Sequence, residues 1–268
     1  MRRSLLRLAV LALLSSLASA PGFAQTCTAD GGQCPLAGHE ADEPVRHSEL
    51  DTAIHDYLVT HPEVLLEAQK ALAAKQTEER EAKARAAIAD NRAALVADPA
   101  DGEFGNPHGD VTIVEFFDNQ CPYCKALAPV LDQLVAADPN VRIVLKEFPI
   151  LGPGSDLAAR YALAVKRQGK YTAFHAALMA DLTPEGQLAE PRLLEIAKSL
   201  GLDLDRLKQD ISAPAFTEQT RRTIALARTV GVTGTPGLVI GTSVQSGAMP
   251  LDSLKEAVRN ARSHGERS

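Results

Sequence analysis

Two cysteines three positions apart, Cys121 and Cys124, are the residues of this chain best suited to chemistry. They follow an apolar stretch at residues 111–117 that predicts a buried strand, and they open a helical pattern at 122–137. Free backbone N–H groups and the helix dipole stabilise a thiolate at a helix N-terminus. We therefore predict that Cys121, closest to those groups and to solvent, is the attacking thiol. Cys124, one turn inward, is then the resolving thiol.

A bare pair of this spacing has two other readings, half of a zinc site or an inert disulfide. Zinc would need a second cysteine pair or two histidines at suitable spacing. His108 and His175 stand alone in the sequence. We therefore favour redox chemistry and predict neither a metal nor a cofactor at this centre.

Glu115 interrupts the apolar stretch six residues before Cys121. A carboxylate in a central strand is unfavourable unless it is paired or protonated. We interpret Glu115 as a buried acid that passes a proton to or from Cys124. Lys146, late in the next predicted strand, is its expected partner. The alternative is that both side chains lie at exposed strand ends.

The elements around these residues follow a recognisable order. A second β-branched strand is predicted at 141–148, and several helical patterns occupy about 154–230. Two short strands at 238–240 and 244–246 and a helix at 251–262 follow. This order is the thioredoxin arrangement: a strand, a helix, a second strand, a helical block, a hairpin and a last helix. We predict an α/β thioredoxin-like fold over 111–268, with a helical insertion and a preceding helical segment.

Gly234, Thr235 and Pro236 stand directly before the first hairpin strand. In a thioredoxin-like fold, a cis proline at this point faces the cysteine pair and leaves an open backbone edge for a substrate chain. Only about 5–6% of X–Pro bonds are cis, so an ordinary trans turn is the alternative. The predicted fold is what favours a cis bond between Thr235 and Pro236.

Residues 47–97 read as a helical oligomerisation segment. Ser48 is expected to cap a short helix, and residues 62–97 predict one helix of 36 residues because no glycine or further proline interrupts them. Charged Lys75 and Glu79 interrupt an otherwise apolar heptad seam, so a rigid coiled coil is not expected throughout. Its apolar members are Leu65, Ala68, Leu72, Ala82, Ala86, Ala89, Ala93 and Val96.

Packing this seam against copies of itself would bury an otherwise exposed apolar face, which predicts a homo-oligomer, taken as a trimer. The alternative is a monomer whose helix folds back on its own catalytic domain. Residues 98–110, with two prolines and three glycines, are expected to be a linker.

The first 24 residues have the layout of a secretory signal peptide: early arginines, an apolar stretch and small residues before a cleavage point after Ala24. Its removal would take away three arginines and change the formal charge from −6 to −9. So acidic a chain has no electrostatic basis for nucleic-acid binding. Export would also let disulfides persist. Residues 25–46, with Cys27 and Cys34, read as a flexible leader.

Three motifs together resemble a known family. The stretch 115–125 (EFFDNQCPYCK), the helical block and the Gly-Thr-Pro at 234–236 resemble the periplasmic DsbA-like thiol–disulfide oxidoreductases. The N-terminal part is similar to the ScsC (suppressor of copper sensitivity) branch of this family. The similarity lies in the stretch 61–68 (HPEVLLEA), the long charged helix and residues 109–111. The resemblance covers about residues 47–262.

This resemblance implies an enzyme that acts on disulfides of exported client proteins in the periplasm. It assigns Cys121 as attacking thiol, Cys124 as resolving thiol, Pro236 as the cis proline and Glu115 as the buried acid. Thr235 is similar to the residue that the isomerases of this superfamily carry, where the dedicated oxidase has valine. An isomerase or reductase is therefore favoured over a DsbA-type dithiol oxidase, with a DsbD-like membrane electron donor as partner.

The sequence leaves three other functions as alternatives. Cys-Pro-Tyr-Cys is also the glutaredoxin tetrapeptide, but Pro236 follows Cys121 by 115 positions, where glutaredoxins need a few tens. Copper or zinc handling would use Cys27, Cys34, His39 and His47, although a disulfide in a loose tail explains the same cysteines. A non-catalytic assembly protein is the third alternative, and the intact cysteine pair argues against it.

Overall fold

The structure, a computed structural model, describes residues 48–264. The predicted signal peptide and the leader with Cys27, Cys34, His39 and His47 lie outside the described residues. The chain divides into two units, Met1–Thr60 and His61–Ser268. Within 48–264, no helix is both long and apolar enough to cross a membrane.

The described part of the first unit is one helix, α1 (Glu49–Thr60). Ser48 begins it as predicted: its Oγ accepts from the Asp51 backbone N–H at 3.2 Å, and its own N–H donates to Asp51 Oδ2 at 3.0 Å. This reciprocal pair satisfies donors that a helix N-terminus leaves free. No residue of α1 is buried. Its exposed apolar side chains are Leu50, Ile54, Tyr57 and Val59.

The second unit begins with two helices where the sequence predicts one. α2 (Glu63–Asp90) ends at Asn91, and α3 (Arg92–Val96) follows. The single helix predicted over 62–97 is therefore wrong at this point. The Asn91 side-chain amide donates to the Ala87 carbonyl at 2.8 Å, and its backbone N–H donates to the same oxygen at 3.0 Å. An asparagine that bonds the preceding turn in this way competes with helix continuation.

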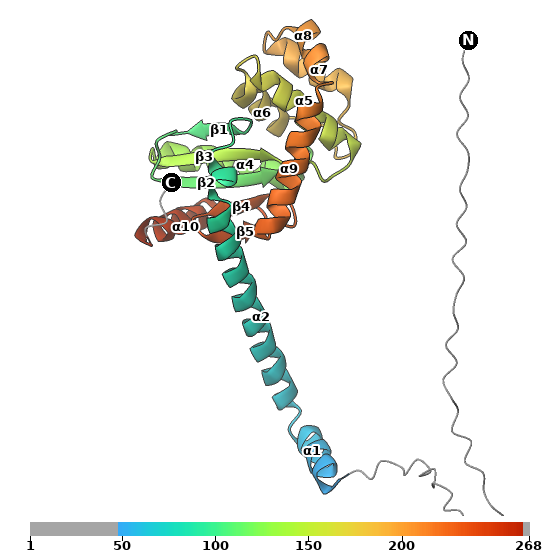
Figure 1. The fold of residues 1–268 in the computed structure, drawn as a ribbon, viewed down its shortest axis with the longest axis vertical. Helices are drawn as coiled ribbons and strands as arrows, with labels where there is room; N and C mark the ends of the chain where they lie inside the picture. Colours follow the sequence, from blue (N-terminus) through green and yellow to red (C-terminus); the bar gives the residue numbers. More distant parts are fainter. Residues whose placement is uncertain (1–47, 265–268) are drawn as a thin grey trace, which may run out of the picture. The chain divides into compact units, whose positions relative to one another are not determined.

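A five-stranded sheet forms the centre of this unit, in the order β1-β3-β2-β4-β5 (Figure 1). The strands are β1 (Gly102–Gly105), β2 (Val111–Phe117), β3 (Val141–Glu147), β4 (Gly237–Ile240) and β5 (Ser243–Ser246). β2 and β3 are parallel, and every other neighbouring pair is antiparallel. All seven residues of β2 are buried, as its nearly unbroken apolar run predicts. The predicted α/β thioredoxin-like fold with a preceding helical segment is confirmed.

Helices cover both faces of the sheet. On one face, α4 (Pro122–Ala137) and α10 (Leu251–Ser263) pack through leucines such as Leu127 and Leu254 onto Ile113 and its neighbours. On the other face, the end of α2, α3 and α9 (Pro214–Val230) pack onto Val114 and Phe116. Alternate β2 side chains thus enter two different cores, because successive residues of a strand point to opposite faces.

The segment predicted as helical at about 154–230 contains five helices (Figure 1). They are α5 (Pro153–Lys166), α6 (Tyr171–Met179), α7 (Glu190–Ser199), α8 (Leu204–Asp210) and α9 (Pro214–Val230). The boundaries of the domains stay a prediction.

β1 lies inside the range 98–110, which the sequence suggests is only a linker. It pairs antiparallel with β3, with Gly102 opposite Leu145. Gly102 is required because a Cβ there would lie 1.8 Å from Cε1 of Tyr171, a buried ring on α6. The glycines that suggest a linker therefore permit close packing of a strand against a helix.

We expect Gly102→Ala to destabilise the protein by about 2 kcal/mol or more, because the new methyl group overlaps a buried ring that cannot move away. Gly234→Ala is the matched control, since a Cβ at Gly234 meets nothing within 4 Å. Urea unfolding of both variants checks this. Equal urea midpoints for the two variants would mean that β1 can shift to accommodate the methyl group without loss of stability.

Candidate active site

Cys121 is the N-cap residue of α4, with extended backbone angles, and Pro122 begins the helix. The side chain is nearly buried, with 4% of the residue exposed, although the sequence suggests a more open position. The pKa of the Cys121 thiol is lowered to about 6. A hydrogen bond from the Cys124 thiol is the largest cause, and the backbone N–H groups of Cys124 and Tyr123 add to it. Cys121 is therefore largely a thiolate at neutral pH.

Cys124 lies one turn into α4 and is fully buried. Its pKa is raised well above the usual range, first because its proton is held in the hydrogen bond to Cys121 and then because of burial. The negative charge of Glu115 raises it further. Both thiols are free in this structure. The two cysteines thus differ in charge at neutral pH: Cys121 is largely ionised, and Cys124 keeps its proton.

Thr235 and Pro236 lie against this centre. The peptide bond between them is cis, as predicted. In its thiol form, Cys121 donates to the Thr235 carbonyl oxygen at 3.3 Å, which places two residues 114 positions apart side by side. The Pro236 carbonyl accepts from the Gly247 N–H at 2.8 Å. The loop before β4 is therefore fixed directly beside the Cys121 sulfur.

Glu115 is buried in the middle of β2, with 2% of its surface exposed. Its register neighbours are Leu145 on β3 and Leu238 on β4. Burial raises the pKa of Glu115 to about 8, and the nearby Cys121 charge contributes in the same direction. The carboxyl group is therefore mostly protonated at neutral pH, within electrostatic reach of both thiols.

The expected pairing of Lys146 with Glu115 is wrong. Lys146 stands in register with Phe116, not Glu115, so it points to the opposite face of the sheet. There it is buried and bonds to the Asp101 carboxylate and the Ala94 carbonyl. Lys146 therefore ties β3 to the end of α3 and the start of β1, away from the cysteines.

Three polar residues before Cys121, Asp118, Asn119 and Gln120, form a hydrogen-bonded frame to which the sequence pattern alone assigns no role. Asp118 Oδ1 accepts from the Gln120 N–H at 2.8 Å and from Ser155 Oγ at 2.7 Å. Its Oδ2 accepts from the backbone N–H groups of Ile150 and Leu151 at 2.8 and 3.0 Å. One buried carboxylate thus joins the cysteine loop, the loop after β3 and the start of α5.

Gln120 extends the frame into the helical insertion. Its Oε1 accepts from the backbone N–H groups of Gly186 and Leu188, at 3.0 and 3.2 Å, and its Nε2 donates to Ser155 Oγ at 2.9 Å. Buried polar side chains need such partners. The run of polar residues between a buried strand and the cysteines is the sequence signal that could have identified this frame.

Asn119 binds a second buried acid, Glu147, at the end of β3. Asn119 Nδ2 donates to Glu147 Oε2 at 2.7 Å, and the Tyr171 hydroxyl donates to Oε1 at 2.8 Å. Burial raises the pKa of Glu147 to about 8. Two protonatable carboxyl groups, Glu115 and Glu147, therefore lie beneath the same loop.

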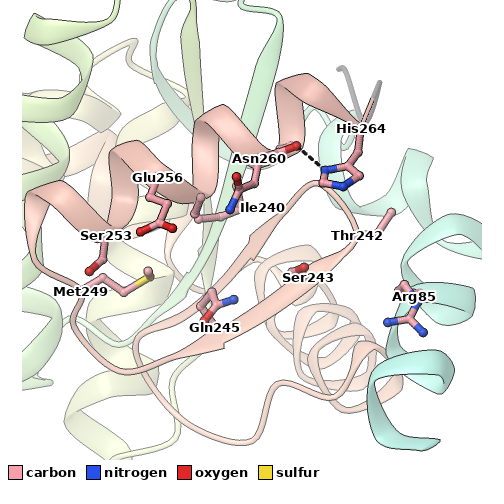
Figure 2. Close-up of a pocket in the computed structure, with 12 residues that line it drawn as sticks. Arg85, Ile240, Thr242, Ser243, Gln245, Met249, Ser253, Glu256, Asn260 and His264 are labelled. Carbon is pink, nitrogen blue, oxygen red and sulfur yellow. Dashed lines mark hydrogen bonds between the residues drawn. The ribbon is translucent and has the colours of Figure 1, made fainter. Parts of the chain in front are cut away.

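Of two cavities in the structure, one lies apart from the cysteines and one reaches Glu115. A hollow of about 500 Å³ lies between β5 and α10, where Figure 2 shows Gln245, Glu256 and Asn260, with His264 bonded to the Asn260 carbonyl. It contains no cysteine. A smaller cavity of about 290 Å³, lined by residues of α4 and α6, reaches Glu115. Over residues 48–264, no three His, Cys, Asp or Glu side chains cluster so as to hold a metal ion.

Family models match two parts of the chain. The model of the DSBA-like thioredoxin domain matches residues 112–259, and that of the copper resistance protein ScsC N-terminal domain matches residues 48–79. The second match falls on α1 and the first part of α2.

Solved structures resemble both parts. A thioredoxin-like oxidoreductase from Silicibacter pomeroyi is 47% identical, with a TM-score of 0.61, over 65% of this chain and 98% of that one. ScsC of Proteus mirabilis in a transitional conformation is 29% identical, with a TM-score of 0.61, over 81% of this chain and 96% of that one.

Curated relatives match over a shorter share of their length. The Na⁺/H⁺ antiporter NhaA 1 of Salinispora arenicola is 30% identical over 159 residues, which is 59% of this chain and 24% of that protein. The chain thus spans about a quarter of this relative. The family match covers most of the sheet and the whole cysteine centre. The chain therefore belongs to the DsbA-like family of thioredoxin-fold oxidoreductases, with an N-terminal segment of the ScsC type.

Proposed function

We propose that this chain rearranges and reduces disulfides of exported proteins in the periplasm, with Cys121 as the attacking thiol. The observation that supports this best is the opposite shift of two neighbouring thiol pKa values, down to about 6 for Cys121 and up for Cys124. A thiolate attacks disulfides, whereas a thiol does not. The buried Cys124 keeps its proton during this first attack.

The proposed reaction begins when the Cys121 thiolate attacks a client disulfide. One client sulfur bonds to Cys121, the client S–S bond breaks, and the other client sulfur leaves as a thiolate that takes up a proton. If that client thiolate attacks another client disulfide, a released thiolate can return to the mixed disulfide and free Cys121. No electrons are then gained or lost, and the disulfides are isomerised.

Reduction follows when Cys124 resolves the mixed disulfide. Cys124 gives its proton to the ionised form of Glu115 and attacks Cys121 Sγ. The Cys121–Cys124 bond forms, and the client sulfur leaves as a second thiolate. Two electrons have passed from the cysteine pair to the client. A membrane donor of the DsbD type would reduce the pair again.

The alternative is a dithiol oxidase of the DsbA type. The strongest oxidant of this superfamily has an attacking thiol with a pKa of about 3.5, because its reduced form is stabilised, whereas thioredoxin has about 7. The value of about 6 for Cys121 favours a weaker oxidant. Scrambled and reduced ribonuclease distinguish the two functions: recovery from the scrambled form supports isomerisation, and rapid oxidation of the reduced form supports the oxidase.

Copper or zinc handling by Cys27, Cys34, His39 and His47 is a weaker candidate. The N-terminal match to a copper resistance protein family is the observation that keeps it open. These four residues lie outside the described residues.

The first prediction concerns the division of labour between the thiols. Cys124→Ser should accumulate mixed disulfides with client proteins, because nothing resolves them, and Cys121→Ser should not. The rate at which the reduced protein is alkylated, measured against pH, should rise with a midpoint of about 6, and this rise should disappear in Cys121→Ser. Equal trapping by the two variants, or a midpoint near that of a free cysteine, would contradict the assignment.

The second prediction concerns Glu115. Glu115→Gln should slow resolution of a mixed disulfide about 100-fold, because it removes the proton acceptor for Cys124. In the unmodified chain, resolution should accelerate as pH rises toward the Glu115 pKa of about 8, since only the carboxylate can accept a proton. The variant should lack this rise.

Stopped-flow mixing with a peptide disulfide measures both rates. Glu190→Gln is the control, because Glu190 is a carboxyl group on α7 that bonds the Tyr161 hydroxyl and does not touch the cysteines. Identical resolution rates and pH profiles for Glu115→Gln and the unmodified chain would show that Glu115 takes no part.

The third prediction concerns assembly. α1 has no buried residue, and α2 exposes Leu65, Leu66 and Leu72 toward its N-terminal end. Ile88, near the other end of α2, is buried in the second unit. We propose that the exposed leucines join copies of the chain, three in number, and that several Cys121 centres then act on one client.

Leu65→Asp combined with Leu72→Asp should convert the assembly to a monomer that still reduces disulfides but loses isomerase activity. Lys70→Asp with Gln76→Asp changes charge on the same helix but off the seam and should leave the assembly intact. Light scattering on the mature chain measures the mass. A mass near one chain before any substitution would refute the assembly.

A further inference from the structure

The cavity between α4 and α6 has no role in the function proposed above. It has a volume of about 290 Å³ and is lined mainly by apolar side chains such as Ala128 and Met179. Glu115 also lines it, although only 2% of that residue is exposed. Lys125 and the exposed Asp132 contribute charged groups from α4. The cavity therefore brings the buried acid close to the surface by a route between two helices.

His175 on α6 lines the same cavity and is 7% exposed. The centroid of its ring lies 6.2 Å from that of Tyr171, with the rings stacked, and 4.8 Å from that of Phe117, with the rings nearly perpendicular. Its Nδ1 is buried and has no hydrogen-bond partner among the described residues. A buried polar atom without a protein partner requires an explanation, and water is the usual one. The volume has room for several water molecules.

Glu115 needs such a route if it serves Cys124. Each resolution adds a proton to the carboxylate, and each regeneration of the pair removes one. The register neighbours Leu145 and Leu238 can neither give nor take a proton. A client bound at Cys121 and Thr235 would cover that side of the site, and proton exchange would then need another path.

We propose that the α4–α6 cavity is this path, and that His175 passes protons through cavity water between Glu115 and solvent. Before Cys124 can resolve a mixed disulfide, the protonated Glu115 must lose its proton, and a water molecule in the cavity takes that proton. A neutral imidazole accepts it on one nitrogen and releases another from its second nitrogen to water at the mouth. Glu115 returns to the carboxylate, and His175 ends neutral. The inference rests on the proposed role of Glu115.

The groups around His175 fit this assignment. Burial lowers the pKa of His175 to about 4, so its ring is neutral and can both accept and donate at neutral pH. Tyr171 already donates to Glu147, and its pKa is raised well above its usual value, chiefly by burial. Lys125 donates to the Asp181 carbonyl at 2.7 Å. His175 is therefore the buried cavity group that is free to exchange protons.

The test compares two substitutions at His175. His175→Phe keeps an aromatic ring against Tyr171 and Phe117 but has no ring nitrogen. It should slow resolution about 10-fold at neutral pH and leave alkylation of Cys121 unchanged. His175→Ala should be equally slow and should be accelerated by added imidazole, which can enter the space. His108→Phe is the control, because His108 lies in the exposed turn before β2.

A third variant narrows the entrance of the α4–α6 cavity and leaves His175 unchanged. Ala176 is exposed on α6 and lines the cavity. Ala176→Phe should narrow the entrance, slow resolution and remove most of the rescue of His175→Ala by imidazole when the two are combined.

Each outcome has a distinct meaning. If His175→Phe resolves at the normal rate while Glu115→Gln is slow, the acid acts but the cavity route is wrong. If His175→Ala is slow and imidazole does not restore it, His175 serves packing, and the relay is again wrong. If Glu115→Gln itself is normal, the proposed function of the acid fails first. Slow His175→Phe with rescue of His175→Ala supports the relay.

Discussion

The hydrogen bond between the two active-site thiols decides how this centre works. Cys121 and Cys124 are three residues apart on one helix turn, and the proton they share stays on Cys124. Two thiolates so close would repel each other in a buried site. The N-terminus of α4 gives its backbone N–H groups to the outer sulfur, so charge collects on Cys121. The inner sulfur stays neutral until the outer one has formed a bond.

This arrangement depends on holding the strand–helix junction rigidly. Asp118, Asn119 and Gln120 connect it to the loop after β3, to β3 itself and to the insertion through buried hydrogen bonds. Because nearly every polar group in this frame has a partner, moving the junction would break several buried bonds at once. The helical insertion therefore fixes the cysteines as well as covering them.

Much of this could be predicted from local pattern. The apolar run of β2 and the cysteines at the start of α4 follow from periodicity and helix-capping chemistry, and Ser48 caps α1 as expected. What failed depends on partners far along the chain. The partner of Lys146 is set by strand register, where a shift of one residue changes the face of the sheet. The strand at Gly102 likewise depends on the distant ring of Tyr171. The end of α2 is the exception, because it follows from a local hydrogen bond of Asn91 to the Ala87 carbonyl.

The same thiol chemistry links the structure to the direction of electron flow. A more acidic attacking thiol stabilises the reduced pair and makes the disulfide a stronger oxidant. Equilibration of the protein with glutathione buffers measures the reduction potential of the Cys121–Cys124 pair directly. We expect about −200 mV, between the roughly −270 mV of thioredoxin and the roughly −120 mV of the strong oxidant DsbA. A value at or above about −120 mV would contradict it, because the pair would then be built to oxidise its clients.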